Sequence, residues 1–233
     1  MIPDRTGRFP ERPHWEIREL EQMCEETITT FLRQHFGFER IPVPTEAVTM
    51  LIERDAADLD LAANLSDDIH EIFGFTQFER GRKPQVTIAR ELWEQRHRSN
   101  RLRTTLTHEY GHVMLHTWLY DKYGAAGGPH RCYWQSLLPT ERVVDWFEWQ
   151  AGYASGALLM PESFARRAVE AYFQNRSERP PIARGTAEAS ALCRRISLAF
   201  DVSVDAATLR LKQLRYLTDR QDPGRFAQTA LNA

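Results

Sequence analysis

The spacing of apolar residues along the chain predicts a protein built mainly of helices. Apolar side chains recur at three- and four-residue steps through residues 14–36, and Gly37 can end that helix. The same periodicity, with start and stop residues at its limits, predicts further helices over residues 45–54, 99–120, 140–159, 162–175, 186–200 and 204–217. Helices therefore account for most of the chain.

Short apolar or alternating runs between the second and third predicted helices indicate strands. These runs cover residues 59–63, 72–78 and 85–89, and a turn-like segment joins the last two. We therefore expect an α+β fold, mainly helical with a small, mostly antiparallel three-stranded sheet. The Gly- and Pro-containing segment 121–139 is expected to be a loop.

Composition and charge exclude several classes of protein. The chain has 233 residues, 42% hydrophobic and 27% charged, which is typical of a folded globular protein. No run approaches the roughly 18 apolar residues of a membrane span, and residues 1–13 lack the apolar run of a secretory signal, so we expect a cytoplasmic protein. A net charge of -2 disfavours direct nucleic-acid binding. Three widely spaced cysteines form no disulfide framework.

The densest chemistry lies in one predicted helix, where His108, Glu109 and His112 form the pattern HExxH. Residues four apart project about 40° from each other around a helix, so both imidazoles can bind one metal ion. Glu109 lies beside them and can take a proton from water at the metal without being a ligand. The motif therefore predicts a zinc (Zn2+) site with Glu109 as the catalytic general base.

Gly111 lies inside this motif. A glycine in a helix interior costs about 1 kcal/mol relative to alanine. Its presence predicts a close approach by a neighbouring strand or helix, and a tolerated surface glycine is the alternative.

A catalytic zinc site needs a third protein ligand, for which Glu148 is favoured. The helix around Glu148 carries small residues that permit a short distance to the HExxH helix. Asp145, one turn earlier, could orient a ligand imidazole or serve as the ligand itself. His116 lies about 12 Å from His108 along the helix axis, too far to share one metal, so we expect it behind a ligand or packed in the core.

Two further groups of residues offer weaker candidates. His130 and Cys132 carry ligating atoms, but a glycine-rich loop is a poor platform for a metal site. The residue that would stabilise an oxyanion stays open among four tyrosines, for each of which packing is the alternative: Tyr110, Tyr123, Tyr133 and Tyr153.

Together, the segment 107–116, Glu148 with Ala151, and the Leu-Leu-Met-Pro run at 158–161 resemble the ImmA/IrrE family of gluzincin-like zinc metallopeptidases. HExxH alone occurs in many zinc peptidases, whereas this combination is more specific. The resemblance covers residues 42–217, about three quarters of the chain, because segment 202–214 is similar to the family's ending.

The resemblance implies a minimal zincin-like fold and a cytosolic endopeptidase. It implies that His108, His112 and Glu148 hold zinc, and that the substrate is a DNA-binding helix-turn-helix repressor of a mobile element, stress response or toxin–antitoxin locus. The chain departs from the family at Gly152, where Asn or Asp is usual, so another residue such as Asp145 must orient the histidine. We expect residues 1–40 to be an N-terminal helical extension, 41–220 the peptidase domain and 221–233 a tail.

The sequence therefore predicts a hydrolase, a zinc metallopeptidase that cleaves a repressor. The alternative is a non-catalytic, zinc-stabilised interaction module that binds a repressor or toxin. Glu109 favours the enzyme, because a structural zinc site has no use for a base beside it. A DNA-binding helix-turn-helix over residues 196–217 is a third hypothesis, which the acidic balance opposes.

Overall fold

A computed structural model describes residues 1–65, 72–124, 130–135 and 145–219 of the chain, and for residues 130–135 it describes the backbone. The chain folds into two compact units, Met1–Leu158 and Leu159–Ala233. Residues 1–40 lie within the first unit, together with the HExxH segment. No helix in these described ranges is both long enough and apolar enough to cross a membrane.

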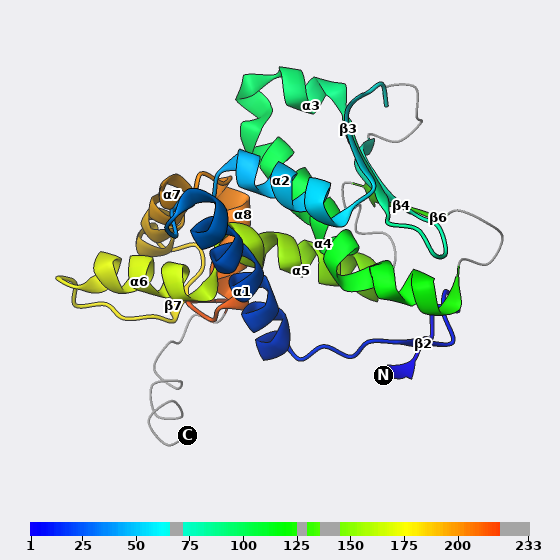
Figure 1. The fold of residues 1–233 in the computed structure, drawn as a ribbon. Helices are drawn as coiled ribbons and strands as arrows, with labels where there is room; N and C mark the ends of the chain where they lie inside the picture. The colour runs from blue at the N-terminus through cyan, green and yellow to red at the C-terminus, as the bar shows by residue number, and fades with distance from the viewer. Residues whose placement is uncertain (66–71, 125–129, 136–144, 220–233) are drawn as a thin grey trace. The chain divides into compact units, whose positions relative to one another are not determined.

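The helices predicted from apolar periodicity are present, with ends within a few residues of expectation (Figure 1). They are α1 (Ile17–Phe36), α2 (Thr45–Asp55), α4 (Ser99–Tyr123), α5 (Trp146–Leu159), α6 (Glu162–Phe173), α7 (Ala187–Phe200) and α8 (Val204–Gln213). Gly37 ends α1 in the left-handed conformation, with φ 81°, as its missing Cβ allows. The short α3 (Arg90–Glu94) was not predicted, and residues 140–144 of the fourth predicted helix lie outside the described residues.

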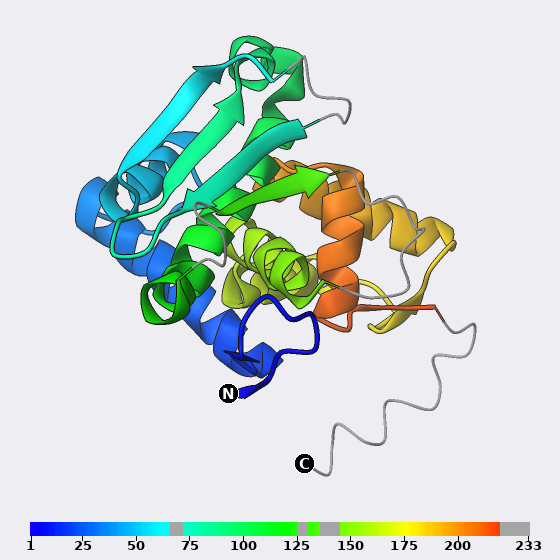
Figure 2. The same cartoon turned by 90° about the vertical axis from the view of Figure 1, so that its right-hand side faces the viewer.

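One sheet in the first unit has the strand order β3-β5-β4-β6 (Figure 2). Its strands are β3 (Asp58–Ala63), β4 (Ile72–Phe78), β5 (Gln85–Ala89) and β6 (His130–Gln135). β4 pairs antiparallel with β5 and with β6, while β3 pairs parallel with β5. A mainly helical α+β fold with a small, mostly antiparallel sheet is thus confirmed; the three predicted strands are present, and β6 adds a fourth.

β6 corrects the expectation that residues 121–139 form only a loop. Most residues of β4 are buried, so this strand lies inside the sheet and is paired on both sides. The composition of residues 121–139 predicted a loop because the segment contains turn-forming residues. Composition does not show whether a strand elsewhere in the chain, here β4, can pair with the segment. Two small pairs were also not predicted: β1 (Ile2–Pro3) with β2 (Glu11–Arg12), and β7 (Ile182–Ala183) with β8 (Leu217–Thr218).

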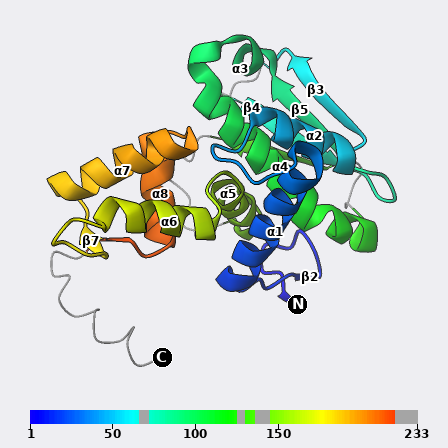
Figure 3. The ribbon, with the colours of Figure 1, turned by 60° about the vertical axis from the view of Figure 1, so that its left-hand side comes forward.

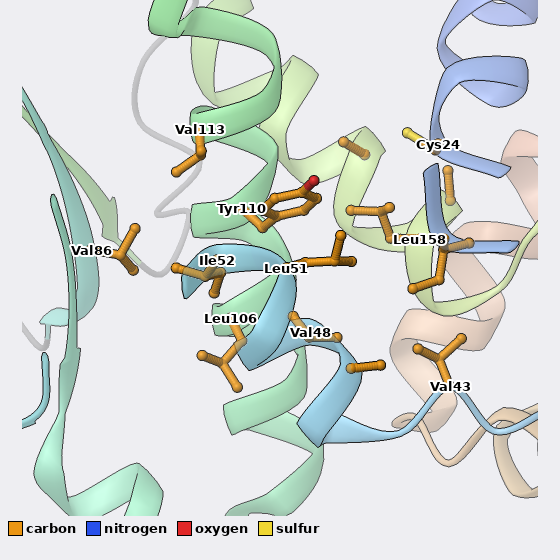
Figure 4. Close-up of a cluster of buried hydrophobic side chains, with 14 of the residues drawn as sticks. Cys24, Val43, Val48, Leu51, Ile52, Val86, Leu106, Tyr110, Val113 and Leu158 are labelled. Carbon is orange, nitrogen blue, oxygen red and sulfur yellow. The ribbon is translucent and has the colours of Figure 1, made fainter. Parts of the chain in front are cut away.

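The main hydrophobic core of the first unit lies between the sheet and the helices α1, α2, α4 and α5 (Figures 1 and 4). In Figure 4, Val86 of β5 faces Ile52 of α2 and Leu106 of α4, while Cys24 of α1 lies on the far side with Leu158 of α5. All five side chains are buried. The helix that carries HExxH is therefore held in the centre of the core.

α4 and α5 approach each other closely at Gly111. A Cβ at this position would lie 3.0 Å from both Cα and the carbonyl oxygen of Ala151. Thr107 and Ser155 extend the contact with a buried hydroxyl–hydroxyl hydrogen bond of 2.7 Å. The close approach predicted from Gly111 is confirmed, and its partner is α5, which Figure 3 shows nearly along its axis.

The second unit holds α6, α7 and α8. Asp201 ends α7 in the left-handed conformation with φ 52°, and the Ser203 hydroxyl caps α8 by accepting a hydrogen bond from Ala206 N at 3.1 Å. The buried Arg210 of α8 donates from Nε to the carbonyl oxygen of Met160 at 3.0 Å. Local capping therefore defines the α7–α8 turn.

We predict that Gly111→Ala destabilises the protein by about 1–3 kcal/mol in urea denaturation, because the new methyl group would overlap the backbone of α5. Gly152→Ala is the matched control, since a Cβ there meets no atom of the described residues within 4 Å. The control should be neutral or up to about 1 kcal/mol more stable. Equal effects of both substitutions would show that helix propensity and not interhelical distance requires Gly111.

Candidate metal centre

α4 places His108 and His112 one turn apart on the face that meets α5. Both are buried, and the Nε2 atoms of the two rings are 3.2 Å apart. The spacing follows from helix geometry, in which residues four apart are neighbours on one face. Two ring nitrogens therefore point at one common position.

Glu148, in the first turn of α5, completes the group. Its Oε2 lies 3.1 Å from His108 Nε2, and its Oε1 lies 3.4 Å from His112 Nε2. The three ligating atoms all lie within 4.8 Å of one another. The structure therefore brings together the three residues predicted as metal ligands, in a group that could hold a metal ion.

The electrostatics of this group suit metal binding. Burial lowers the pKa of His108, which favours the neutral imidazole. Burial alone would raise the pKa of Glu148, but the neighbouring His112 and His108 rings hold it well below its usual range. A neutral imidazole and an ionised carboxylate are the forms that coordinate a metal.

Glu109 is fully buried next to this group. Its Oε2 accepts a hydrogen bond of 2.7 Å from the hydroxyl of Thr76 on β4. Its Oε1 is also buried and has no hydrogen-bond partner among the described residues. Burial raises the pKa of Glu109 well above its usual range; the Thr76 hydrogen bond opposes this shift, and the charge of Glu148 adds to it. Glu109 is thus a carboxyl group suited to holding a proton, with one oxygen available to a further partner.

His116 lies directly behind His112. The two Nδ1 atoms are 3.1 Å apart, and Nε2 of His116 lies 3.0 Å from Oε1 of Gln150 on α5. The ring of Phe147 stacks on His116 with centroids 3.7 Å apart. Burial lowers the pKa of His116 well below its usual value, with a smaller contribution from His112, so the ring is neutral.

Sequence reasoning missed Gln150 and Thr76. Gln150 had one recognisable signal, since it is a polar residue within an otherwise apolar stretch of helix and directly follows the first turn with Glu148. Thr76 had none, because its role depends on where β4 crosses α4. The polar side chain that contacts the buried histidines from α5 is therefore Gln150, through His116.

Asp145 has neither of the roles expected for it. Its carboxylate binds both terminal nitrogens of Arg8, at 3.2 and 2.7 Å, and Oδ1 accepts from Phe147 N at 3.0 Å. Asp145 precedes the first residue of α5, so its side chain turns back to satisfy a free backbone N–H instead of following the face of Glu148. It fixes the start of α5.

The candidate tyrosines are bound to carboxylates elsewhere. Tyr110 donates to Asp55 Oδ2 at 2.8 Å, Tyr153 donates to Glu21, and Tyr123 donates to Glu11. The side chains of three other candidates, Tyr133, His130 and Cys132, lie outside the described residues. The three described hydroxyls thus have structural hydrogen bonds.

We expect Asp145→Ala to lower the free energy of unfolding by about 1–2 kcal/mol, because it removes an N-terminal helix cap and the pair with Arg8. Metal affinity, measured by calorimetric titration, should stay close to that of the unsubstituted protein. Asp145→Asn keeps the capping oxygen and should lose at most about 1 kcal/mol. Loss of metal with unchanged stability in the alanine variant would return Asp145 to the ligand set.

Comparison of the chain with models of known protein families finds no match, and comparison with curated proteins finds none either.

Proposed function

We propose that the protein is a zinc-dependent endopeptidase, with His108, His112 and Glu148 as the metal ligands. Two histidines and one glutamate are a ligand set typical of catalytic zinc. Bonds of about 2.0–2.1 Å in a tetrahedron place ligand atoms about 3.3 Å apart. The separation of 3.2 Å between the two Nε2 atoms and that of 3.1 Å between His108 Nε2 and Glu148 Oε2 agree with that spacing, which supports zinc at this position.

When bound, zinc would polarise the carbonyl of the scissile peptide bond and make water more acidic. Glu109 takes up the proton of the attacking water at Oε1 and then gives it to the leaving amine. Thr76 holds Oε2, which orients the carboxyl group and leaves Oε1 for the proton. The direction of the shift matches this task, because burial raises the pKa of Glu109 and makes its carboxylate a stronger base.

The unpartnered Oε1 of Glu109 is the observation that carries the proposal. Leaving a buried polar atom without a hydrogen bond costs about 1–3 kcal/mol, so such an atom needs a reason. Among the side chains that the structure describes, no donor reaches it. A purely structural metal site gains nothing from this arrangement, whereas a peptidase needs a base at this position. This favours the enzyme over the interaction module.

We propose a DNA-binding helix-turn-helix repressor as the substrate, encoded by a mobile element, stress response or toxin–antitoxin locus and cut in the cytoplasm. The basis is the resemblance of the HExxH, Glu148 and Leu-Leu-Met-Pro segments to repressor-cleaving peptidases. The net charge of -2 gives the chain no general attraction to DNA, so a partner would carry the operator binding. A linker between repressor domains suits a peptidase, because it offers extended backbone without unfolding.

Replacing the third ligand tests the zinc site. Glu148→Ala should weaken zinc binding by more than the 10–100-fold that is typical of removing an outer hydrogen-bond partner. Metal content by mass spectrometry and affinity by competition with a chromophoric chelator are the measurements. Asp145→Ala, a carboxylate removed three residues earlier, is the matched control and should retain zinc. Zinc bound equally well by both variants would contradict the proposed ligand set.

Replacing the base tests catalysis. Glu109→Gln can keep a hydrogen bond with Thr76 but cannot take a proton, so we expect zinc retention with hydrolysis reduced by roughly 100-fold or more. The assay incubates zinc-loaded protein with purified helix-turn-helix repressors and identifies fragments by mass spectrometry. Loss of zinc in this variant would make Glu109 a ligand. Tight repressor binding without cleavage by the unsubstituted protein would instead support the interaction module.

A further inference from the structure

Three buried side chains form a line of hydrogen bonds that ends at the metal centre. His112 contacts His116 through their Nδ1 atoms at 3.1 Å, and His116 Nε2 contacts Gln150 Oε1 at 3.0 Å. The exposed fractions are 0%, 0% and 2%, respectively. The other ring nitrogen of His112, Nε2, is the atom that faces His108 and Glu148.

The acceptor at the end of this line determines where each proton lies. An amide oxygen only accepts, so Nε2 of His116 must carry a proton toward Gln150. A neutral imidazole with its proton on Nε2 has a bare Nδ1, which accepts from His112. A neutral His112 then carries its proton on Nδ1 and has a lone pair on Nε2, the form that can bind a metal.

The opposite order would block the site. If a donor occupied the place of Gln150 Oε1, His116 would accept at Nε2 and donate from Nδ1. His112 would then accept at Nδ1 and carry its proton on Nε2, pointing at the position where a ligand lone pair is needed. The identity of one acceptor on α5 therefore selects between a metal-binding and a blocked His112.

Water cannot easily take over the role of Gln150. Phe147 stacks on the rings of His116 and His112, with centroids 3.7 and 4.9 Å apart. The ring of Trp146 stands edge-on to His116 at 5.8 Å. A buried imidazole enclosed by aromatic rings depends on its protein partners for hydrogen bonding, because an unsatisfied polar group in the interior is costly.

We propose that Gln150 is a positioning residue that acts through His116 to hold His112 in the tautomer that leaves Nε2 free for metal. The proposal deepens the proposed function, because its consequence for zinc affinity rests on His112 being a zinc ligand. The arrangement itself belongs to the folded chain and precedes metal binding.

The direct test is the proton position in the unsubstituted, metal-free protein. Long-range proton–nitrogen NMR correlations of histidine rings near neutral pH report which nitrogen carries the proton. We expect a proton on Nε2 of His116, with Nδ1 bare, and a proton on Nδ1 of His112. A proton on Nδ1 of His116 would overturn the proposal, whatever the protein's metal affinity.

Variants test the consequence for zinc. Gln150→Met keeps the length of the side chain without the acceptor and should weaken zinc binding about 10–100-fold, as loss of an outer partner typically does. Gln150→Glu keeps the acceptor as long as its carboxylate is ionised, and in that form its zinc affinity should stay close to that of the unsubstituted protein. Ser155→Ala is the matched control, since it removes a buried α4–α5 hydrogen bond outside this line and should leave zinc affinity unchanged.

Circular dichroism melting of each metal-free variant checks that the fold is retained. Equal zinc affinity in Gln150→Met and the unsubstituted protein would overturn the proposal, and so would an equal loss in Ser155→Ala. If Gln150→Met does not fold, the NMR result on the unsubstituted protein decides. If the unsubstituted protein binds no zinc at all, the proposed function fails, while the tautomers in the metal-free protein still test Gln150.

Discussion

The candidate site depends on how closely α4 and α5 can approach. Gly111 has no side chain, so the backbone of α5 at Ala151 comes within 3.0 Å of the position that a Cβ would occupy. The side chains on either side of this contact then meet across the interface: Glu148 with His108 and His112, Gln150 with His116, and Ser155 with Thr107. A side chain at residue 111 would separate the helices, and each of these hydrogen-bond distances would lengthen.

This interface is unusual in placing many polar groups inside a hydrophobic core. His108, Glu109, His112, His116 and Gln150 are all at most 2% exposed, and each loses hydration on folding. Mutual hydrogen bonds offset that cost, and the low local dielectric strengthens them. The group is consequently rigid, because any displaced partner would leave a buried polar atom unsatisfied. Glu109 Oε1 is the exception among these side chains, and this is why the proposed chemistry is assigned to that atom.

The N-terminal segment also supports the centre. Arg8 pairs with Asp145 at the start of α5, Asp4 accepts from the indole nitrogen of Trp146 at 3.0 Å, and the Phe9 ring packs edge-to-face on Tyr120. The first two contacts hold the beginning of α5, and with it Phe147, whose ring covers His116. Farther along α5, the Tyr153 hydroxyl donates to Glu21 of α1. The sequence predicts that residues 1–40 are an extension. In the structure, parts of this segment contact α5, the helix that supplies Glu148.

Local geometry explains what the sequence by itself determined. The 3.6-residue period defined the helices, and the i, i+4 spacing aligned His108 with His112, because both follow from the conformation of a single continuous segment. Glu148 could be singled out because small residues beside it signalled a close helix contact. The roles of Thr76, Asp145 and Gln150, and the existence of β6, depended on contacts between segments far apart in the chain. No local pattern encodes such contacts, since they arise only when packing brings a strand, a helix start and an amide oxygen to the same buried place. The tertiary structure alone decided that Gln150 stands behind His116 and that Thr76 holds Glu109.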